Sequence, residues 1–352
     1  MKTFKNPRDI KVGVIGYGGA FNMGNAHLKQ MHKQGMTPFA VCEVDPERLK
    51  VAEQDWPGIE THSKVEDLLK KSDVDLIVHI TPHNLHYPLA AKCVKAGKHV
   101  VTEKPFVVTT NEADKLIPLA EKHGVMVSTY HNRHWDGWIL RARREVEKGS
   151  IGDVHRVELR FGKYGPPQDW WRTSKSISGG VMYDWGVHLL EYALQVTPGN
   201  IVEVSGFAKT GHWEKEIGKK TRFAGDFNED EATAIVRFDT GAVIDMRISQ
   251  LDPIPRPPMS IFGNKGSYIV ESFKSEDRGW VMNKADAKYK LKETAGKHAP
   301  GKQHLFYKNI ADYLTGKDEL IITPQWARRP IHILDLADRS AKQNKAIKAK
   351  YG

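Results

Sequence analysis

Three residues of this chain have the types and the spacing for acid–base chemistry: Lys104, Asp184 and His188. Lys104 follows a short apolar run and precedes Pro105, so we expect a rigid turn that presents an ammonium group at the end of a strand. Asp184 and His188 are four residues apart after a pair of glycines, which predicts that they share one face of a helix opened by those glycines. An imidazole beside a carboxylate is suited to take the proton of an alcohol. Packing of His188 inside the helix, or metal binding by the pair, stays open, although no third ligand follows at a fixed spacing.

A glycine turn near the start of the chain predicts a nucleotide site. The β-branched run 10–15 ends at Gly16-Tyr17-Gly18-Gly19, and a helical pattern follows. Such glycines allow the backbone to approach a pyrophosphate, whose charge is stabilised at a helix N-terminus. The third glycine of the usual pattern is displaced to Gly24, so we interpret residues 20–23 as an enlarged loop.

Glu43 is the predicted ribose-binding acid. It ends the apolar run 38–42 and lies 25 residues after Gly18, near the usual spacing of about 20. A carboxylate there accepts hydrogen bonds from the ribose hydroxyls and repels a 2′-phosphate. The prediction is therefore NAD rather than NADP, and the nearby Arg48 weakens that preference.

Strand and helix patterns alternate through the first part of the chain, which predicts a doubly wound parallel sheet. From about Gly152 onward, consecutive strands with tight turns predict a large, mainly antiparallel sheet in an α/β domain, closed by helices over 304–314 and 324–348. We expect a Rossmann domain over 1–130 and a substrate and oligomerisation domain over 131–352, with the last helices free to pack on the first domain.

The composition narrows the class of protein. With 352 residues, 40% hydrophobic and 27% charged, the chain is long enough for two globular domains. No apolar run reaches the roughly 18 residues of a membrane span, and residues 1–11 are polar, so we expect a cytoplasmic protein that does not act at a membrane. Two cysteines, Cys42 and Cys93, exclude a disulfide framework. The net charge of +10 comes without an arginine-rich block, so no nucleic-acid partner is expected.

Taken together, these motifs resemble the Gfo/Idh/MocA family, named for glucose–fructose oxidoreductase, inositol dehydrogenase and a rhizopine-catabolism protein. The resemblance covers most of the chain. It depends on Gly16-Tyr17-Gly18-Gly19, on Ala96-Gly97-Lys98-His99 leading into Glu103-Lys104-Pro105, and on Gly179-Gly180 with Asp184, Gly186 and His188. The enlarged loop and Glu43 in place of the commoner Asp depart from the family pattern.

The resemblance implies an oxidoreductase that transfers a hydride between NAD and a secondary alcohol or ketone of a small sugar or polyol. His188 would take the hydroxyl proton, Asp184 would orient the imidazole, and Lys104 would hydrogen-bond the same oxygen. The expected cofactor contacts are Gly16, Gly18, Gly19, Ala20, Glu43, Thr81, Pro82, His83, His86, Glu103, Lys104 and His131. The expected substrate contacts are Lys104, Arg133, Trp171, Arg172, Asp184 and His188, with no metal. A homodimer or homotetramer through the C-terminal sheet is also implied.

Two other functions fit the same residues. One is an NAD-dependent glycoside hydrolase or lyase, in which the cofactor is reduced and reoxidised within one turnover. The other is a non-catalytic NAD-binding regulatory protein, which has no need of Lys104, Asp184 and His188 together. Interdomain packing is the alternative role for the tryptophans near Arg172.

Overall fold

The computed structural model describes residues 2–19, 21–273 and 277–350 of the chain. It divides into two compact units, and each is described by itself. The first contains residues 1–131 and 304–328, and the second contains residues 132–303 and 329–352. Residues 304–328 are thus the late segment that folds with the N-terminal part of the chain.

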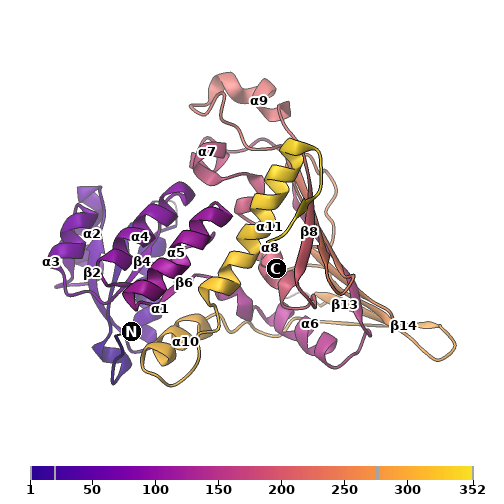
Figure 1. Ribbon diagram of the computed structural model, residues 1–352, viewed down its shortest axis with the longest axis horizontal. Coiled ribbons are helices and arrows are strands. Elements are labelled where there is room, and N and C mark those ends of the chain that lie inside the picture. The colour runs from indigo at the N-terminus through magenta and orange to yellow at the C-terminus, as the bar shows by residue number, and fades with distance from the viewer. Residues whose placement is uncertain (1, 20, 274–276, 351–352) are drawn as a thin grey trace. The chain divides into compact units, whose positions relative to one another are not determined.

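The first unit is built on a six-stranded sheet in which every ladder is parallel (Figure 1). Its strands, in the spatial order β3-β2-β1-β4-β5-β6, are β3 Glu60–His62, β2 Thr37–Cys42, β1 Lys11–Ile15, β4 Leu76–His79, β5 His99–Thr102 and β6 Val127–Thr129. This order is that of a dinucleotide-binding Rossmann sheet. The predicted doubly wound sheet is confirmed.

The register of this sheet aligns the carboxyl ends of five strands. Ile15 pairs with Cys42 on one side and with His79 on the other, His79 pairs with Thr102, and Thr102 pairs with Thr129. The residues that directly follow these five therefore emerge in one row at one edge. In open α/β sheets this edge is where ligands bind.

The helices of the first unit begin and end at residues that the sequence marks. They are α1 Met23–Lys33, α2 Pro46–Asp55, α3 Val65–Lys71, α4 His86–Lys95, α5 Thr110–His123 and α10 Leu305–Leu314. Thr109 and Glu112 form a capping box at the start of α5, and Gly124 ends that helix with a φ of 61°. Helices α4 and α5 lie side by side (Figure 1). Because helices cover the sheet, its central strands β1, β4 and β5 are mostly apolar, with Val14, Val78 and Val101 fully buried.

The second unit contains a nine-stranded sheet. In spatial order its strands are β14 Leu291–Gly296, β13 Trp280–Ala285, β12 Gly266–Val270, β11 Met259–Gly263, β7 Val154–Gly162, β10 Val243–Ser249, β9 Glu231–Phe238, β8 Ile201–Lys209 and β15 Ile347–Lys348. Only β7 and β10 pair in parallel among these described strands. The predicted mainly antiparallel sheet is confirmed.

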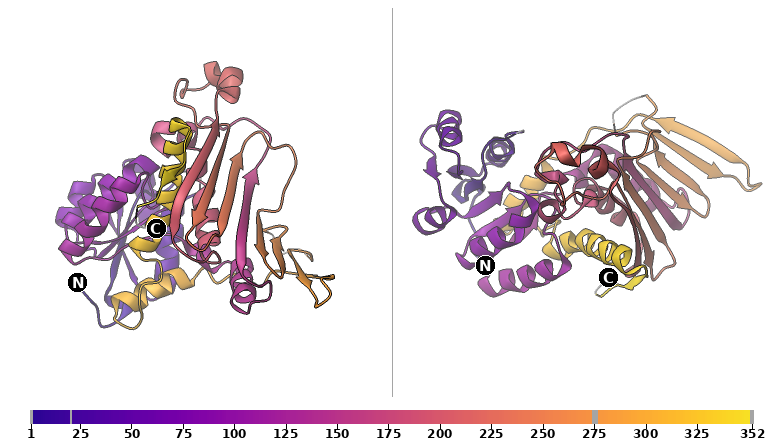
Figure 2. Two further views of the ribbon diagram at one scale, coloured as in Figure 1. Left: turned by 45° about the vertical axis from the view of Figure 1, so that its right-hand side comes forward. Right: turned by 90° about the horizontal axis from the view of Figure 1, so that it is seen from above.

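The second unit also contains α-helices, and one of them lies very close to the sheet. The helices are α6 Gly137–Glu147, α7 Lys175–Ser178, α8 Gly186–Leu194, α9 His212–Ile217 and, mostly in this unit, α11 Pro324–Gln343. A Cβ on Gly206 of β8 would fall 1.9 Å from the carbonyl oxygen of Ala337 in α11, so only glycine lets this helix lie against the strand (Figure 2). The amide of Gly206 also donates to Oγ of Ser340 at 2.8 Å.

The structure differs from the sequence-based expectation at three places. The helices α2, α6, α7 and α9 and the strands β3, β13, β14 and β15 were not predicted. The last helix ends at Gln343 rather than at residue 348, because Asn344 takes a left-handed conformation with a φ of 50°. Finally, the glycine pair before Asp184 opens no α-helix, as described below.

None of the helices in the described part of the chain is long and apolar enough to cross a membrane. Cys42 and Cys93 are both buried and free, as expected.

Candidate active site

The expected cofactor residues of the first unit follow the carboxyl ends of its strands. Gly16, Gly18 and Gly19 come after β1, Glu43 after β2, Thr81, Pro82, His83 and His86 after β4, Glu103 and Lys104 after β5, and His131 after β6. Ala20 lies outside the described residues. The parallel topology thus brings the described members of this set to one edge of the sheet, as the sequence predicted. Their roles in binding stay predictions.

The glycine turn after β1 has the backbone that a pyrophosphate site needs. Gly16, Gly18 and Gly19 all have positive φ angles of 99°, 115° and 77°, which residues with a side chain rarely adopt. A Cβ on Gly16 would fall 2.3 Å from the carbonyl oxygen of Ile80, so β1 and the end of β4 pass each other without room for a methyl group.

Gly24 performs the task of the displaced third glycine. It lies in the first turn of α1, which is capped by the side chain of Asn22. A Cβ on Gly24 would fall 2.5 Å from the carbonyl oxygen of Gly16. The start of α1 therefore packs directly on the glycine turn, as in sites where a helix N-terminus faces a phosphate. This cradle fits the pyrophosphate of a dinucleotide.

The Glu43 carboxylate is held by three backbone amides. Its Oε2 accepts from the N–H of Tyr17 at 2.8 Å, and its Oε1 accepts from the N–H groups of Val44 at 2.7 Å and Asp45 at 3.1 Å. Glu43 thereby ties the loop after β2 to the glycine turn after β1. A carboxylate offers about four lone-pair positions, so this acid is mostly committed to the protein's own backbone.

Arg48 lies over the same glycine turn. A Cβ on Gly18 would fall 2.8 Å from Cδ of Arg48, and its Nε lies 3.4 Å from Oδ2 of Asp45. A guanidinium thus lies on the turn that Glu43 also holds.

His86 links the loop after β4 to the segment after β5. Its Nδ1 lies 2.6 Å from the carbonyl oxygen of Pro105, and its Nε2 lies 3.1 Å from that of Thr81. Burial lowers the pKa of His86, and a neutral imidazole has one N–H for the two carbonyl oxygens. The side chain therefore positions two loops of the sheet edge from inside the protein.

Lys104 follows a buried chain of hydrogen bonds. Oε2 of Glu103 accepts from the backbone N–H of Lys104 at 2.9 Å, and Oε1 lies 3.0 Å from Nε2 of His27. Nδ1 of His27 lies 2.6 Å from the hydroxyl of Tyr307, in α10. Burial alone would raise the pKa of Glu103, but the hydrogen bond from His27 and the charge of Lys104 lower it below its ordinary value. The peptide bond from Lys104 to Pro105 is cis.

In the second unit, the ring of Trp185 contacts two of the candidate residues, Arg133 and His188. The guanidinium of Arg133 lies 5.1 Å from its centroid, and the ring of His188 meets it edge-on at 5.7 Å. Phe161 of β7 stacks on Trp185 with centroids 4.4 Å apart. The Arg133 guanidinium is further held by the carboxylate of Asp136 at 3.3 Å. Trp185 therefore fixes Arg133 and His188 against one aromatic surface.

Arg172 makes cation–π contacts with two aromatic rings and an ion pair with a carboxylate. Its guanidinium lies 4.5 Å from the Trp170 ring and 4.3 Å from the Trp171 ring. Its Nε lies 3.4 Å from Oδ1 of Asp184. The structure thus joins three of the expected substrate residues, Trp171, Arg172 and Asp184, in one cluster.

The prediction that Asp184 and His188 share an α-helix opened by glycines is wrong. Gly179, with a φ of 89°, ends the short helix α7, and Gly180, with a φ of 140°, precedes a single 3₁₀ turn over Val181–Tyr183. Helix α8 begins only at Gly186, so it contains His188 but not Asp184. Because both glycines have positive φ, the backbone turns at Gly179-Gly180 and does not continue as a right-handed helix.

Sequence reasoning did not find the partners of these residues that come from distant parts of the chain. Tyr307 follows His27 by 280 residues. Phe161, in strand β7, stacks on Trp185, which directly precedes helix α8. The periodicity around Tyr307 marks it only as an apolar helix position. No local signal in the sequence identifies such pairs.

Comparisons with known proteins agree with this fold. Residues 10–131 match the family profile described as "Oxidoreductase family, NAD-binding Rossmann fold", and residues 139–269 match the "GFO/IDH/MocA C-terminal domain". The chain is 28% identical over 358 residues to the uncharacterized oxidoreductase YdgJ of Escherichia coli, covering 96% of this chain and 98% of that protein. It is 25% identical to the scyllo-inositol 2-dehydrogenase (NADP(+)) IolW of Bacillus subtilis, covering 96% and 95%.

A solved structure shows the same fold. The NAD-binding protein from Listeria innocua superposes with a TM-score of 0.78, at 24% identity, over 97% of each chain. Both halves of the chain match the corresponding family profiles, and the relatives are covered almost from end to end. This chain therefore belongs to the Gfo/Idh/MocA family of oxidoreductases, with an NAD(P)-binding Rossmann fold in its N-terminal half.

Proposed function

We propose that this protein is an NAD-dependent dehydrogenase that acts on a secondary alcohol or ketone of a sugar or polyol. The observation that carries the proposal is the row at the carboxyl edge of the parallel sheet, where Lys104 emerges with the glycine turn and Glu43. The substrate class is supported by the similarity to the inositol dehydrogenase IolW.

The dinucleotide would be held by the glycine turn and the start of α1, with its ribose near Glu43 and Arg48. Hydride exchange is the chemistry that a bound nicotinamide supplies. Because Glu43 is a carboxylate fixed by three amides, its negative charge cannot turn away from a 2′-phosphate, which supports NAD as the preferred cofactor. IolW is named as NADP-linked, so NADP is the competing cofactor for the test.

The chain's own residues would handle the proton and the charge on oxygen. His188 would accept the hydroxyl proton of the substrate, and Lys104 would donate a hydrogen bond to that oxygen and stabilise its developing negative charge. Asp184, which is paired with Arg172, would orient the imidazole of His188. Glu103, fixed by His27, would hold the backbone from which the Lys104 side chain extends.

The substrate would lie against the aromatic and cationic cluster of the second unit. Indole faces pack well on the apolar faces of sugar rings, and guanidinium groups donate in a fixed planar geometry. Trp171 with Arg172, and Arg133 against Trp185, provide both kinds of contact. We also propose a homodimer or homotetramer through the nine-stranded sheet, to be measured by light scattering on the purified protein.

The test follows the absorbance of reduced nicotinamide when the protein is mixed with NAD⁺ or NADP⁺ and a panel of free sugars, inositols and glycosides. We expect reduction with at least one free sugar or polyol. Lys104→Ala and His188→Ala should each lower kcat by about 100-fold or more while NAD binding persists. Wild-type turnover in both variants would disprove the assignment of these residues. A flat signal accompanied by glycoside cleavage would replace the dehydrogenase by the hydrolase or lyase alternative.

A further inference from the structure

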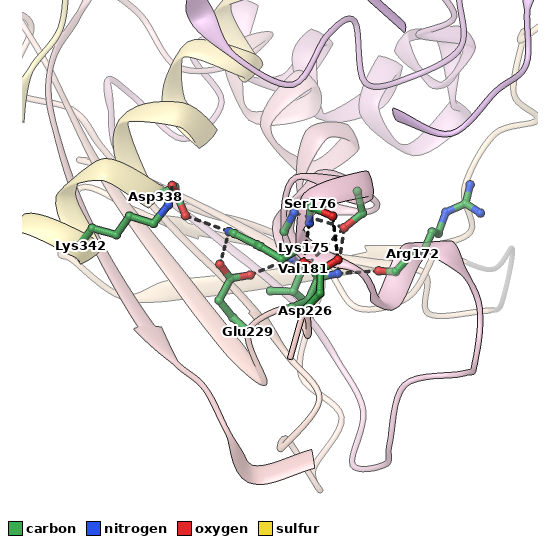
Figure 3. Close-up of polar contacts among 11 residues, drawn as sticks. Arg172, Lys175, Ser176, Val181, Asp226, Glu229, Asp338 and Lys342 are labelled. Carbon is green, nitrogen blue, oxygen red and sulfur yellow. Dashed lines mark hydrogen bonds and ion pairs between the residues drawn. The ribbon is translucent and has the colours of Figure 1, made fainter. Parts of the chain in front are cut away.

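A short loop of the second unit, residues 226–229, holds the segment 172–181 by several hydrogen bonds (Figure 3). Nδ2 of Asn228 donates to the carbonyl oxygen of Arg172 at 2.5 Å. The carboxylate of Asp226 accepts a backbone N–H of the same segment at 2.9 Å. The segment that leads to Asp184 and His188 is therefore held by side chains about 50 residues further along the chain, in addition to its own local hydrogen bonds.

A cluster of three charged side chains reinforces this attachment. Nζ of Lys175 contacts Oε1 of Glu229 and lies 2.8 Å from Oδ1 of Asp338 in α11 (Figure 3). The three side chains are 27%, 10% and 21% exposed, so the ion pairs are largely shielded from water. Burial alone would lower the pKa of Lys175, but the charges and hydrogen bonds of Glu229 and Asp338 raise it above its ordinary value. The lysine is thus a fixed cation that joins three parts of the second unit.

The Lys175–Glu229 ion pair lies directly against the backbone of the Gly179-Gly180 turn. Oε2 of Glu229 accepts the N–H of Val181 at 3.0 Å. A Cβ on Gly180 would fall 2.8 Å from Nζ of Lys175 and 3.0 Å from Oε2 of Glu229. Gly180 has a φ of 140°, which is one of several backbone conformations open to glycine. Contacts with neighbouring groups therefore select this conformation. The Lys175–Glu229 pair supplies those contacts.

We propose that Lys175 and Glu229 are positioning residues for the reaction: they set the path of the Gly179-Gly180 turn and, through it, the placement of Asp184 and of the helix that contains His188. This inference rests on the proposed function, because it assigns the two residues a task toward its candidate catalytic groups. Neither Lys175 nor Glu229 is assigned a contact with substrate or cofactor. Their effect is indirect, through the three residues of backbone between Gly180 and Asp184.

The expected effect falls on the chemical step and not on cofactor binding. Displacement of a catalytic group by about 1 Å lowers turnover by about 100-fold. Lys175→Met removes the cation that faces Glu229, and Glu229→Gln removes the anion while keeping the shape of the side chain. Each variant should lower kcat for the sugar or polyol by about 10- to 100-fold. The Kd for NAD should stay within about twofold, because the predicted cofactor residues belong to the other unit.

Lys342 provides a matched control. Its Nζ lies 2.7 Å from Oδ2 of Asp338, the same carboxylate that Lys175 contacts, but it is 68% exposed and its side chain binds no part of the segment 172–181 among the contacts found in the described residues. Lys342→Met therefore removes a lysine partner of Asp338 but keeps the Lys175–Glu229 pair beside the Gly179-Gly180 turn. This variant should keep wild-type kcat. Lys175→Arg keeps the charge and should restore most of the activity that Lys175→Met loses.

The experiment combines steady-state kinetics, NAD titration and amide hydrogen exchange on the full-length protein and these four variants. We expect Lys175→Met and Glu229→Gln to speed exchange in residues 174–185, whereas Lys342→Met leaves it unchanged. If wild-type protein is active and Lys175→Met has the kcat and the exchange of Lys342→Met, the inference is wrong and the proposed function stands. If wild-type protein oxidises no sugar or polyol, the proposed function fails, and unchanged exchange in the variants would still overturn the positioning role. Should Lys175→Met not fold, Glu229→Gln and Lys175→Arg carry the same comparison.

Discussion

Replacing Tyr307 by Phe tests whether the buried chain behind Lys104 contributes as its geometry indicates. The change removes one oxygen from a side chain that is 1% exposed. Glu103 can only accept, so a neutral His27 must donate from Nε2 to its carboxylate and accept at Nδ1 from the Tyr307 hydroxyl, 2.6 Å away. In Tyr307→Phe, that ring nitrogen loses its donor inside the protein.

The magnitude follows from the burial of this group. A buried acceptor left without its partner costs about 1–3 kcal/mol of stability. For a domain of this size, each kcal/mol lowers the melting temperature by about 2–4 °C. We therefore expect the variant to melt several degrees below wild type. Urea titration should give a matching loss in the free energy of unfolding with an unchanged m-value, because the surface exposed on unfolding is the same.

Tyr313→Phe, on the same helix but only half-buried, is the control and should change stability by no more than about 0.5 kcal/mol. A double-mutant cycle with His27→Leu should show coupling between positions 27 and 307, because the second change removes the acceptor. A stability of Tyr307→Phe equal to that of the control would refute the reasoning. The hydroxyl would then not be the donor to His27, and the chain would end at the histidine.

Three further predictions concern the first unit. Gly24→Ala places a methyl group 2.5 Å from the carbonyl oxygen of Gly16, so NAD affinity measured by titration should fall at least about tenfold; unchanged affinity would mean that α1 does not need to pack on the glycine turn. Glu43→Gln removes the fixed negative charge, so the Kd for NADP divided by the Kd for NAD should fall by about tenfold or more. Arg48→Ala removes the positive charge and should raise the same ratio. An equal ratio in wild type and both variants would show that neither charge affects the choice of cofactor. Burial lowers the pKa of His99 to about 4 from an ordinary value of 6.5. Between these two pH values the unfolded state binds more protons than the folded state, so the free energy of unfolding should decline as the pH falls from about 6.5 to 4. A free energy of unfolding that stays level over this window would contradict the buried, uncharged imidazole.

Local patterns were sufficient to predict most elements of the Rossmann sheet. β-branched runs, a glycine turn and capped helices follow each other in an order that only a parallel sheet accommodates, and the predicted row of residues at its carboxyl edge is observed. Two of the missed strands have weak patterns. Strand β3 has three residues, none of them fully buried, and β14 is exposed over nearly its whole length, so neither shows an apolar periodicity.

The glycine motifs show where local patterns become insufficient. The displaced third glycine was visible in the sequence, but its role required the distance from Gly24 to the carbonyl oxygen of Gly16. The pair Gly179-Gly180 was interpreted as the start of a helix because the residues that follow are apolar and helical in spacing. The ion pair that occupies the space beside Gly180 comes from Glu229, which no helical pattern can reveal.

The sequence by itself determined the fold class, the family and the positions of the candidate residues along the chain. These depend on periodicity and spacing, which report interactions between near neighbours and between strands in a regular order. Tertiary structure alone decided what those residues contact. Glu43 is committed to the amide of Tyr17, Asp184 to Arg172, and Lys175 to an acid 163 residues away. Burial strengthens the contacts of Glu43 and Lys175, and it is a property of the assembled fold, because side chains far apart in sequence exclude water from one another only after the chain has packed.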